Sequence, residues 1–245
     1  MTPSAKVKHI SNWILNYVNS MPKKAESLVI GISGGIDSSV SSTLSALTGL
    51  KTIVLSMPIN QIKSQHDLSI KHQEWLVKNF KNVKAHTINL DNLFNSFKTT
   101  LSDFDNEHGL ANSRARLRMA TLYQVASSNN GIVVGTGNKV EDFGVGFYTK
   151  YGDGGVDISP IADCNKTEVW EIGKELKILD EIIKAEPTDG LWDDGRTDTG
   201  QLGLKYNELE EAMNNPNSEN REKYEKIRKL NLHKMESIPV CKIPN

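Results

Sequence analysis

Short apolar runs alternate along the chain with longer segments in which apolar side chains recur every three or four residues. Four apolar runs have the length of a strand: Leu28–Ile30, Lys51–Ser56, Val83–Leu90 and Gly131–Gly135. Five segments have the spacing of a helix: 4–19, 38–48, 66–80, 91–101 and 112–128. This alternation predicts a doubly wound α/β fold, in which helices cover both faces of a parallel sheet.

The pattern changes after Thr136. Glycines recur through 137–157, which we expect to form a long loop with a functional role. Asn165 and Glu168 have the spacing of a capping box and predict a helix over 166–177.

A second polar, glycine-rich loop is predicted over 189–203. Two charged helices follow, near 206–213 and 219–231. We expect a single domain over 1–245, with its core at about 25–180 and a C-terminal helical segment at about 205–245.

Composition limits the classes of protein to which the chain can belong. Of 245 residues, 38% are hydrophobic and 24% are charged, as in ordinary globular domains. The net charge of −1 gives no reason to expect nucleic acid or a membrane surface as a partner. Two cysteines make no disulfide framework, and the sequence contains no signal peptide or apolar segment of membrane-spanning length, so we expect a cytoplasmic protein.

The stretch Leu28–Ser39, LVIGISGGIDSS, predicts a binding site for an anion. A strand buried on both faces leads into a turn at Ser33, Gly34 and Gly35, and a helix begins near Asp37. Adjacent glycines leave backbone N–H groups uncovered, and a helix N-terminus adds partial positive charge, so phosphate is the favoured anion. The loop differs from the common P-loop because no lysine follows its glycines.

The run SGGIDSS at 33–39 resembles the SGGxDS loop of the ATP pyrophosphatases, which hold the pyrophosphate of ATP while its AMP moves to a substrate oxygen. Further motifs follow along the chain: Asn-x-x-Ala-Arg at 112–116, GTGNKVE at 135–141, FYTKYGDGGVDISP at 147–160, Asn165-Lys166, Pro187-Thr188 and His233-Lys234. Together they resemble the motifs of the ammonia-dependent NAD⁺ synthetases. TKYGDGG at 149–155 is the most specific of them.

The resemblance implies a fold and a reaction. The fold would be Rossmann-like, of the adenine nucleotide alpha hydrolase type. The nicotinate carboxylate of deamido-NAD⁺ would attack the α-phosphate of ATP, with Mg²⁺ as cofactor, to give an acyl adenylate and pyrophosphate. Ammonia would then displace AMP and form NAD⁺. The partners are thus ATP, deamido-NAD⁺ and ammonia, in a homodimer with the dinucleotide site at the subunit interface.

The resemblance also implies a role for each matching residue. The residues implied for ATP are Gly31, Ile32, Ser33, Gly34, Gly35, Ile36, Asp37, Ser38, Thr136, Lys166 and Thr188. The residues implied for deamido-NAD⁺ are Tyr17, Asn112, Arg116, Lys150, Asp157, His233 and Lys234. Asp37 and Glu141 would hold Mg²⁺, which prefers hard oxygen ligands. Lys166 and Asp153 would be catalytic, and Asp153 would bind the incoming ammonium and accept its proton.

The residues alone allow simpler explanations for several of these positions. The arginines at the start of the helix over 112–128 would form a solvated face, and Tyr17 would pack in the core. Asp153 would satisfy its own turn. Lys166 would be an ordinary surface lysine.

The chain departs from the resemblance in two places. Many relatives carry Arg-Leu-Pro after the second strand, where this chain has Ser-Met-Pro at 56–58. The ATP contact of that arginine is therefore absent or supplied elsewhere, with these candidates: Gln61, Lys63 and Gln65. The segment between Glu141 and Lys150 is also one residue longer, which leaves the register of 142–146 open.

Other functions are compatible with parts of the sequence. Another SGGxDS enzyme could adenylate a different carboxylate or a tRNA base, although the near-neutral charge argues against tRNA and TKYGDGG against the rest. A non-catalytic adenine-nucleotide sensor would leave the charged residues of these motifs without a common reason to be present. We expect free ammonia as the nitrogen donor, because the chain leaves no room for the nitrilase-like domain of glutamine-using relatives. We also expect the loops 60–65 and 189–203 to be mobile and to close over ATP.

Overall fold

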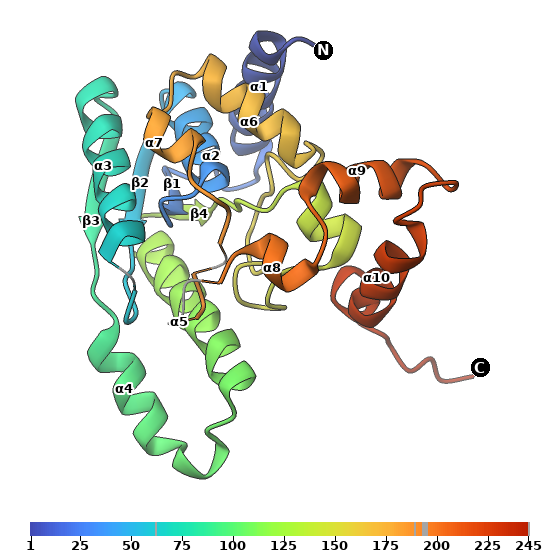
Figure 1. The fold of residues 1–245 in the computed structure, drawn as a ribbon. Helices are drawn as coiled ribbons and strands as arrows, with labels where there is room; N and C mark the ends of the chain where they lie inside the picture. The colour runs from blue at the N-terminus through green and yellow to red at the C-terminus, as the bar shows by residue number, and fades with distance from the viewer. Residues whose placement is uncertain (62, 189, 193–195, 245) are drawn as a thin grey trace.

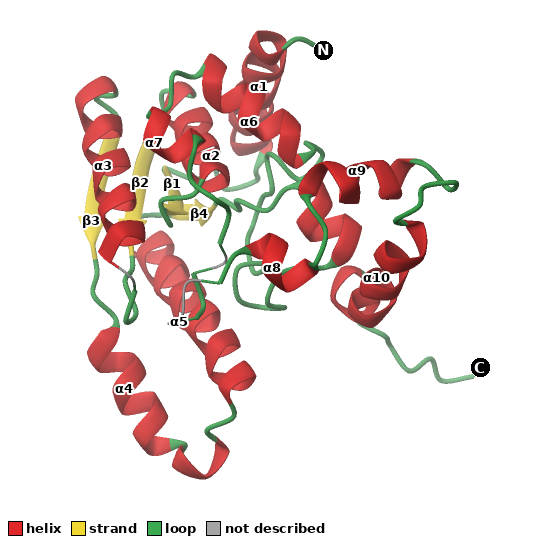
Figure 2. Ribbon diagram, in the orientation of Figure 1, coloured by secondary structure: helices red, strands yellow, loops and turns green. Residues whose placement is uncertain are grey.

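Four parallel strands form the sheet in the part of the chain that the structure describes. The computed structural model describes residues 1–61, 63–188, 190–192 and 196–244, and the side chain of Gln65 also lies outside this description. The strands are β1 (Ser27–Gly31), β2 (Lys51–Ser56), β3 (Val83–Thr87) and β4 (Gly131–Val133). Their order in the sheet is β3-β2-β1-β4, and all pairs are parallel (Figures 1 and 2).

Both faces of β1 are buried, as its continuous apolar run predicted, whereas the edge strand β3 is largely exposed. Leu28 and Ile30 of β1 pack into one cluster, whereas Val29, which points the opposite way, packs into another. The first cluster includes side chains of α1 (Pro3–Ser20), α2 (Ile36–Leu47), α3 (Lys63–Asn79) and α6 (Lys166–Glu175). The second includes side chains of α4 (Asp91–Thr100) and α5 (Glu107–Ser128). The predicted doubly wound α/β fold is therefore confirmed.

A third apolar cluster lies beside the sheet and carries the C-terminal helices. It joins η2 (Val140–Val145) to α9 (Tyr206–Asn214) and α10 (Arg221–Met235), with Val140, Leu204 and Leu209 among its buried side chains. Figure 1 shows α9 and α10 beside the sheet, with the C-terminal tail extending away from them. Three shorter elements complete the description: η1 (Ser102–Phe104), α7 (Asp180–Ile183) and α8 (Asp198–Leu202).

Several boundaries differ from the sequence prediction. The helix predicted from 112 begins at Glu107, because the Asn106 side chain accepts a hydrogen bond from the N–H of Gly109 (2.8 Å) and caps it. The predicted strand 83–90 ends at Thr87, and the predicted helix 166–177 ends at Glu175. On α1, Trp13 and Tyr17 are 41% and 39% exposed, so the proposed packing of Tyr17 in the core is wrong.

Two segments predicted as loops contain helical turns. In 189–203, α8 begins where the Thr197 hydroxyl accepts from the N–H of Gly200 (3.1 Å) and ends at Gly203, whose φ is +68°. The rest of that prediction falls partly on 189 and 193–195, outside the described residues. In 137–157, Val140–Val145 forms a π-helical turn, which closes its hydrogen bonds over one more residue than an α-helical turn.

The described helices were also compared with the length and hydropathy of a membrane span. None of them is at once long and apolar enough to cross a bilayer.

Candidate active site

A cavity of about 480 Å³ opens at the carboxyl ends of β1 and β4. These two strands are neighbours, but the chain leaves β1 toward β2 and β3 on one side and places β4 on the other. Ligands of open α/β sheets bind at such a point, where the order of strands reverses. The lining comes mainly from five segments: 31–38, 111–122, 134–137, 146–156 and 185–192.

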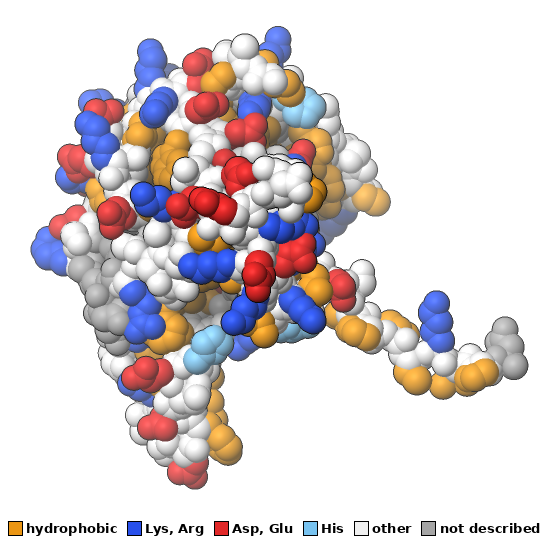
Figure 3. Space-filling view, turned by 45° about the vertical axis from the view of Figure 1, so that its right-hand side comes forward, with side chains coloured by type: hydrophobic (Ala, Val, Ile, Leu, Met, Phe, Trp, Pro, Cys, Tyr) orange, Lys and Arg blue, Asp and Glu red, His pale blue; other side chains and the backbone are white. Residues whose placement is uncertain are grey.

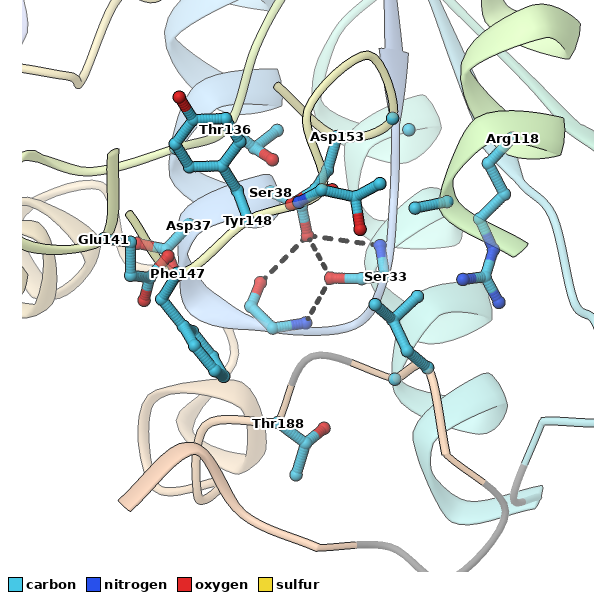
Figure 4. A pocket seen from close by; sticks show the side chains of 18 of the residues that line it. Ser33, Asp37, Ser38, Arg118, Thr136, Glu141, Phe147, Tyr148, Asp153 and Thr188 are labelled. Carbon is cyan, nitrogen blue, oxygen red and sulfur yellow. Dashed lines mark hydrogen bonds between the residues drawn. The ribbon is translucent and has the colours of Figure 1, made fainter. Parts of the chain in front are cut away.

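The loop after β1 is braced by its own serines. The Ser33 and Ser38 hydroxyls lie 3.0 Å apart, the Ser38 hydroxyl donates to the carbonyl of Gly35 (3.0 Å), and the N–H of Gly35 donates to the Ser33 hydroxyl (3.2 Å; Figure 4). Gly34 has a φ of +94°, a conformation that strongly favours glycine. The N-terminus of α2 follows directly, with N–H groups that have no partner within the helix. This stretch can therefore hold phosphate oxygens.

Lys166, Asp37 and Glu141 meet at one end of this loop. The Lys166 ammonium donates to Asp37 Oδ2 at 2.5 Å and to Glu141 Oε1 at 2.9 Å. Lys166 is only 2% exposed, so it is not a surface lysine. Burial by itself lowers the pKa of this ammonium, but the charges of Asp37 and Glu141 outweigh burial and hold its pKa above the usual range.

Three residues that the sequence analysis did not assign support this group. The Asn138 amide donates to Asp37 Oδ1 (3.2 Å), and its oxygen accepts from the N–H of Glu141 (3.1 Å). The Tyr206 hydroxyl lies 2.5 Å from Glu141 Oε1 and 2.8 Å from Asp198 Oδ2. Asn138 lies inside the GTGNKVE motif, which could have pointed to it. Tyr206 and Asp198 carried no signal, because they lie in segments without a recognisable motif.

Asp153 lies in a tight turn at another wall of the cavity. Its Oδ1 accepts from the N–H of Thr149 (2.9 Å), so Asp153 does satisfy its own turn, and the Thr149 hydroxyl donates to Asn112 Oδ1 (2.7 Å). Nearby, Asp142 has its pKa raised to about 8, first by burial and then by the charges of Glu141, Asp153 and Asp37. This wall of the cavity is therefore rich in carboxylates and attracts cations.

The residues implied for the dinucleotide fall into two groups. Asn112 and Lys234 line the cavity. Arg116 donates to the carbonyl of Lys150 (3.3 Å), and the Lys150 ammonium donates to the carbonyl of His233 (2.6 Å). These three form a connected group outside the cavity lining.

Asp157 and Tyr17 also lie outside the lining. Asp157 accepts from the N–H of Val133 (2.7 Å) and from the Tyr123 hydroxyl (3.1 Å), which ties the segment after the cavity to β4 and α5. Tyr17 stacks on Trp13 at the surface of α1, with ring centroids 5.9 Å apart. The implied ATP residues Thr136 and Thr188 do line the cavity (Figure 4).

An arginine does lie at the end of β2, although it comes from α5. Arg118 lines the cavity, and its Nε donates to the carbonyl of Met57 (3.0 Å). Among the predicted substitutes, Gln61 lines the cavity, whereas the exposed Lys63 pairs with Asp67 (2.7 Å). The side chain of Gln65 lies outside the described residues.

Comparison with known proteins agrees with these features. The family model for NAD synthase matches residues 6–244. The NH(3)-dependent NAD(+) synthetase of Methanosarcina acetivorans is 36% identical over 208 residues, which cover 82% of this chain and 79% of that protein. The corresponding protein of Mesoplasma florum is 37% identical over 238 residues, 94% of each chain. An NMN synthetase structure from Francisella tularensis matches with a TM-score of 0.91 and 31% identity, covering 99% of this chain and 100% of that one. The chain is therefore an enzyme of the NAD synthase family.

Proposed function

We propose that the protein amidates deamido-NAD⁺ with ammonia, using ATP and Mg²⁺, through an acyl-adenylate intermediate that yields NAD⁺, AMP and pyrophosphate. The proposal depends on one observation: three groups with different chemistry lie around the same cavity. These are the braced loop at 33–38, the buried ion pair of Lys166 with Asp37 and Glu141, and the carboxylate-rich turn at Asp153. An enzyme that activates a carboxylate with ATP and then attacks it with ammonia needs all three.

In this proposal the loop at 33–38 and the N-terminus of α2 bind the phosphates of ATP. Asp37 and Glu141 fit a divalent cation, because their oxygens already converge on a single cationic atom, Lys166 Nζ. The described residues contain no cluster of three or more metal-ligating side chains, so phosphate oxygens would complete the coordination. Bound there, Mg²⁺ supplies charge neutralisation for the leaving pyrophosphate.

Asp153 is proposed to serve the second step. Ammonium is not a nucleophile, and a carboxylate both attracts it and can accept its proton. The N–H of Thr149 donates to Asp153 Oδ1, which holds this carboxylate at the wall of the cavity where the incoming cation would meet it. Burial raises the pKa of the neighbouring Asp142 to about 8, so Asp142 is mostly protonated at neutral pH and gains charge as the pH rises.

A second substrate is favoured by one of the solved structures. The structure with a TM-score of 0.91 is titled an NMN synthetase, and NMN is the amide of nicotinate mononucleotide. This substrate presents the same nicotinate carboxylate to ATP but lacks the AMP half of the dinucleotide. The lining residues Asn112 and Lys234 could serve either molecule, whereas the group of Arg116, Lys150 and His233 outside the cavity favours the longer one.

We propose a homodimer in which the partner subunit completes the dinucleotide site. Figure 1 shows α4 and the start of α5 projecting from the body as an arm, and Figure 3 shows hydrophobic side chains along one side of this arm and along the C-terminal tail. On the arm, Leu93 and Phe104 are 51% and 75% exposed. Exposed apolar side chains of this size are typical of an interface.

We further propose that Arg118 supplies the positive charge that many relatives place after the second strand. Its guanidinium stands on the wall of the cavity beside Ser33, at the end of β2 (Figure 4). The bond from Nε to the carbonyl of Met57 holds the guanidinium in place, and a planar, permanently charged guanidinium suits phosphate oxygens.

The central test is a direct assay. With ATP, Mg²⁺ and NH₄Cl, deamido-NAD⁺ should yield NAD⁺ and AMP in equal amounts, and Asp37→Asn should abolish pyrophosphate release while leaving the thermal melt intact. The same assay with nicotinate mononucleotide should give a lower kcat/KM. A higher value on the mononucleotide would replace the dinucleotide with the second candidate. Activity on neither substrate would overturn the proposal.

The dimer is tested by sedimentation. The protein should sediment at twice the mass of the chain, and Leu93→Asp should shift it toward the monomer because a charge then lies in the apolar contact. Leu47→Asp is the matched control, since Leu47 is a 45% exposed leucine on the body of the protein. A wild-type monomer at the concentrations of the assay would contradict the dimer.

The role of Arg118 is tested by measuring the KM of each substrate separately in the Arg118→Met variant. Losing a hydrogen bond to a charged group costs about 1.5–3 kcal/mol, so Arg118→Met should raise the KM for ATP roughly 10- to 100-fold. The KM for ammonia should stay unchanged. Arg116→Met should instead raise the KM for deamido-NAD⁺. An unchanged KM for ATP in Arg118→Met would show that the arginine only supports the backbone at Met57.

Asp153→Asn separates the two half-reactions. Asparagine retains an oxygen that can accept from the N–H of Thr149, so the turn should persist while the charge and the proton acceptor are lost. The pyrophosphate burst should therefore remain, and amidation should slow by ~10²–10⁴-fold. Part of this loss should return as the pH rises toward the pKa of ammonium, because free NH₃ needs no deprotonation.

The measurement is rapid quench of pyrophosphate and NAD⁺ across pH, with Asp153→Ala as the variant that loses the turn bond as well. If burst and amidation fall together in Asp153→Asn, the residue holds the turn or the dinucleotide and does not serve ammonia.

A further inference from the structure

The Lys166 ammonium lies in the position that a bound cation would take. It is within 2.9 Å of oxygens from both Asp37 and Glu141, the two carboxylates proposed to hold Mg²⁺. Figure 4 shows these two carboxylates side by side at the edge of the cavity. The oxygens that converge on Lys166 Nζ are thus the same ones that a metal ion would use.

The surroundings of Lys166 explain why it stays there. Lys166 is the first residue of α6, where the helix dipole disfavours a positive charge. The two carboxylates outweigh this effect, and the ammonium also lies over the Tyr206 ring, 4.7 Å from its centroid. The hydroxyl of the same tyrosine fixes Glu141 at 2.5 Å. Lys166 is therefore held on several sides by groups that favour its charge.

Displacing this ammonium is unfavourable unless it finds another anion. Removing one partner from a buried ion pair is strongly unfavourable, because the remaining charge is left buried and unpaired. A free divalent cation that bound Asp37 and Glu141 would impose this cost on Lys166, which is 2% exposed. A triphosphate bound at the loop 33–38 would remove the cost, because its oxygens offer the ammonium a new partner.

We propose that Lys166 closes the cation site in the nucleotide-free enzyme and releases Asp37 and Glu141 only when the phosphates of a nucleotide arrive. The metal ion therefore enters together with the nucleotide and not before it. Lys166 has two roles in this view: it is the internal counter-ion of the empty site and the phosphate ligand of the filled one. The inference rests on the proposed use of ATP and a divalent cation at this site.

Mn²⁺ is the probe, because its free concentration can be followed by electron paramagnetic resonance without any turnover. Without nucleotide, wild type and Lys166→Arg should bind Mn²⁺ weakly, and Lys166→Met should bind it roughly tenfold or more tightly, because two buried carboxylates then lack a counter-ion. Mn²⁺ should also raise the Tm of Lys166→Met more than that of wild type. Lys139→Met is the matched control, since it removes a lysine that pairs with the exposed Asp163 (2.9 Å) and should gain no Mn²⁺ site.

Wild type provides a test that needs no variant. Adding a non-hydrolysable ATP analogue should increase its affinity for Mn²⁺ well beyond the affinity of the analogue alone for the ion. The inference is overturned if wild type binds Mn²⁺ without nucleotide as tightly as Lys166→Met does. If wild type binds Mn²⁺ that tightly without nucleotide and still amidates its substrate, only this inference fails. If Lys166→Met gains the Mn²⁺ site but wild type amidates neither substrate, the proposed function fails and the inference about the cation site stands.

Discussion

The buried ion pair of Lys166 with Asp37 and Glu141 is the interaction on which the arrangement of the site depends, because it joins three elements that are distant in the sequence. Asp37 lies in the first turn of α2, Glu141 in η2 and Lys166 at the start of α6. A charge at any one of these positions would be costly to bury alone. Together they draw the loop at 33–38, the segment after β4 and the following helix to one point at the edge of the sheet.

The connection extends from this ion pair to another segment that lines the cavity. Glu141 shares the Tyr206 hydroxyl with Asp198 of α8, and the residues before α8, Gly190 to Trp192, line the cavity. The guanidinium of Arg114 also donates to the carbonyl of Leu191. A change in the partners of Glu141 would therefore also alter the hydrogen bonds that position α8 and the lining residues before it.

The sequence predicted the fold well because its signals are local. The strands are short, apolar and bounded by turns, and the glycines and serines of 33–38 recur in a recognisable order. Where the prediction was wrong, the missing information was not local. The residues alone allowed Tyr17 to pack in the core, but periodicity does not say how much of a helix surface its neighbours cover, and Tyr17 is 39% exposed. The start of α5 was missed because Glu107 to Ala111 carry little apolar periodicity.

The residues of the site also fall into two groups: those that local motifs indicate and those that only the fold reveals. Asp37, Glu141 and Lys166 lie in motifs, and the structure brings both carboxylates within hydrogen-bond distance of the Lys166 ammonium. The burial of Lys166 could not be read from the sequence, because it arises only when Tyr206 and the two carboxylates surround it. Tyr206 lies in a segment with the composition of an ordinary surface helix and Asp198 in one predicted as a polar loop, so no pattern distinguished them. Arg118 lies next to a motif, but only the fold shows that α5 passes the end of β2.

The π-helical turn at Val140–Val145 fixes the spacing between the two halves of the site. It is followed by Gly146, whose φ is +66° and where a Cβ would lie 2.6 Å from the Cβ of Asn231, so the chain reverses at a fixed point against α10. In an α-helix each residue turns the chain by about 100°, and in the wider π-helical turn the angle is somewhat smaller. Deleting one residue here would rotate Glu141 by about that angle relative to the turn that carries Asp153, or else move that turn away from α10. The carboxylates of Glu141 and Asp153 are thus held in a fixed orientation relative to each other. A change in the length of this segment would alter the positions of both.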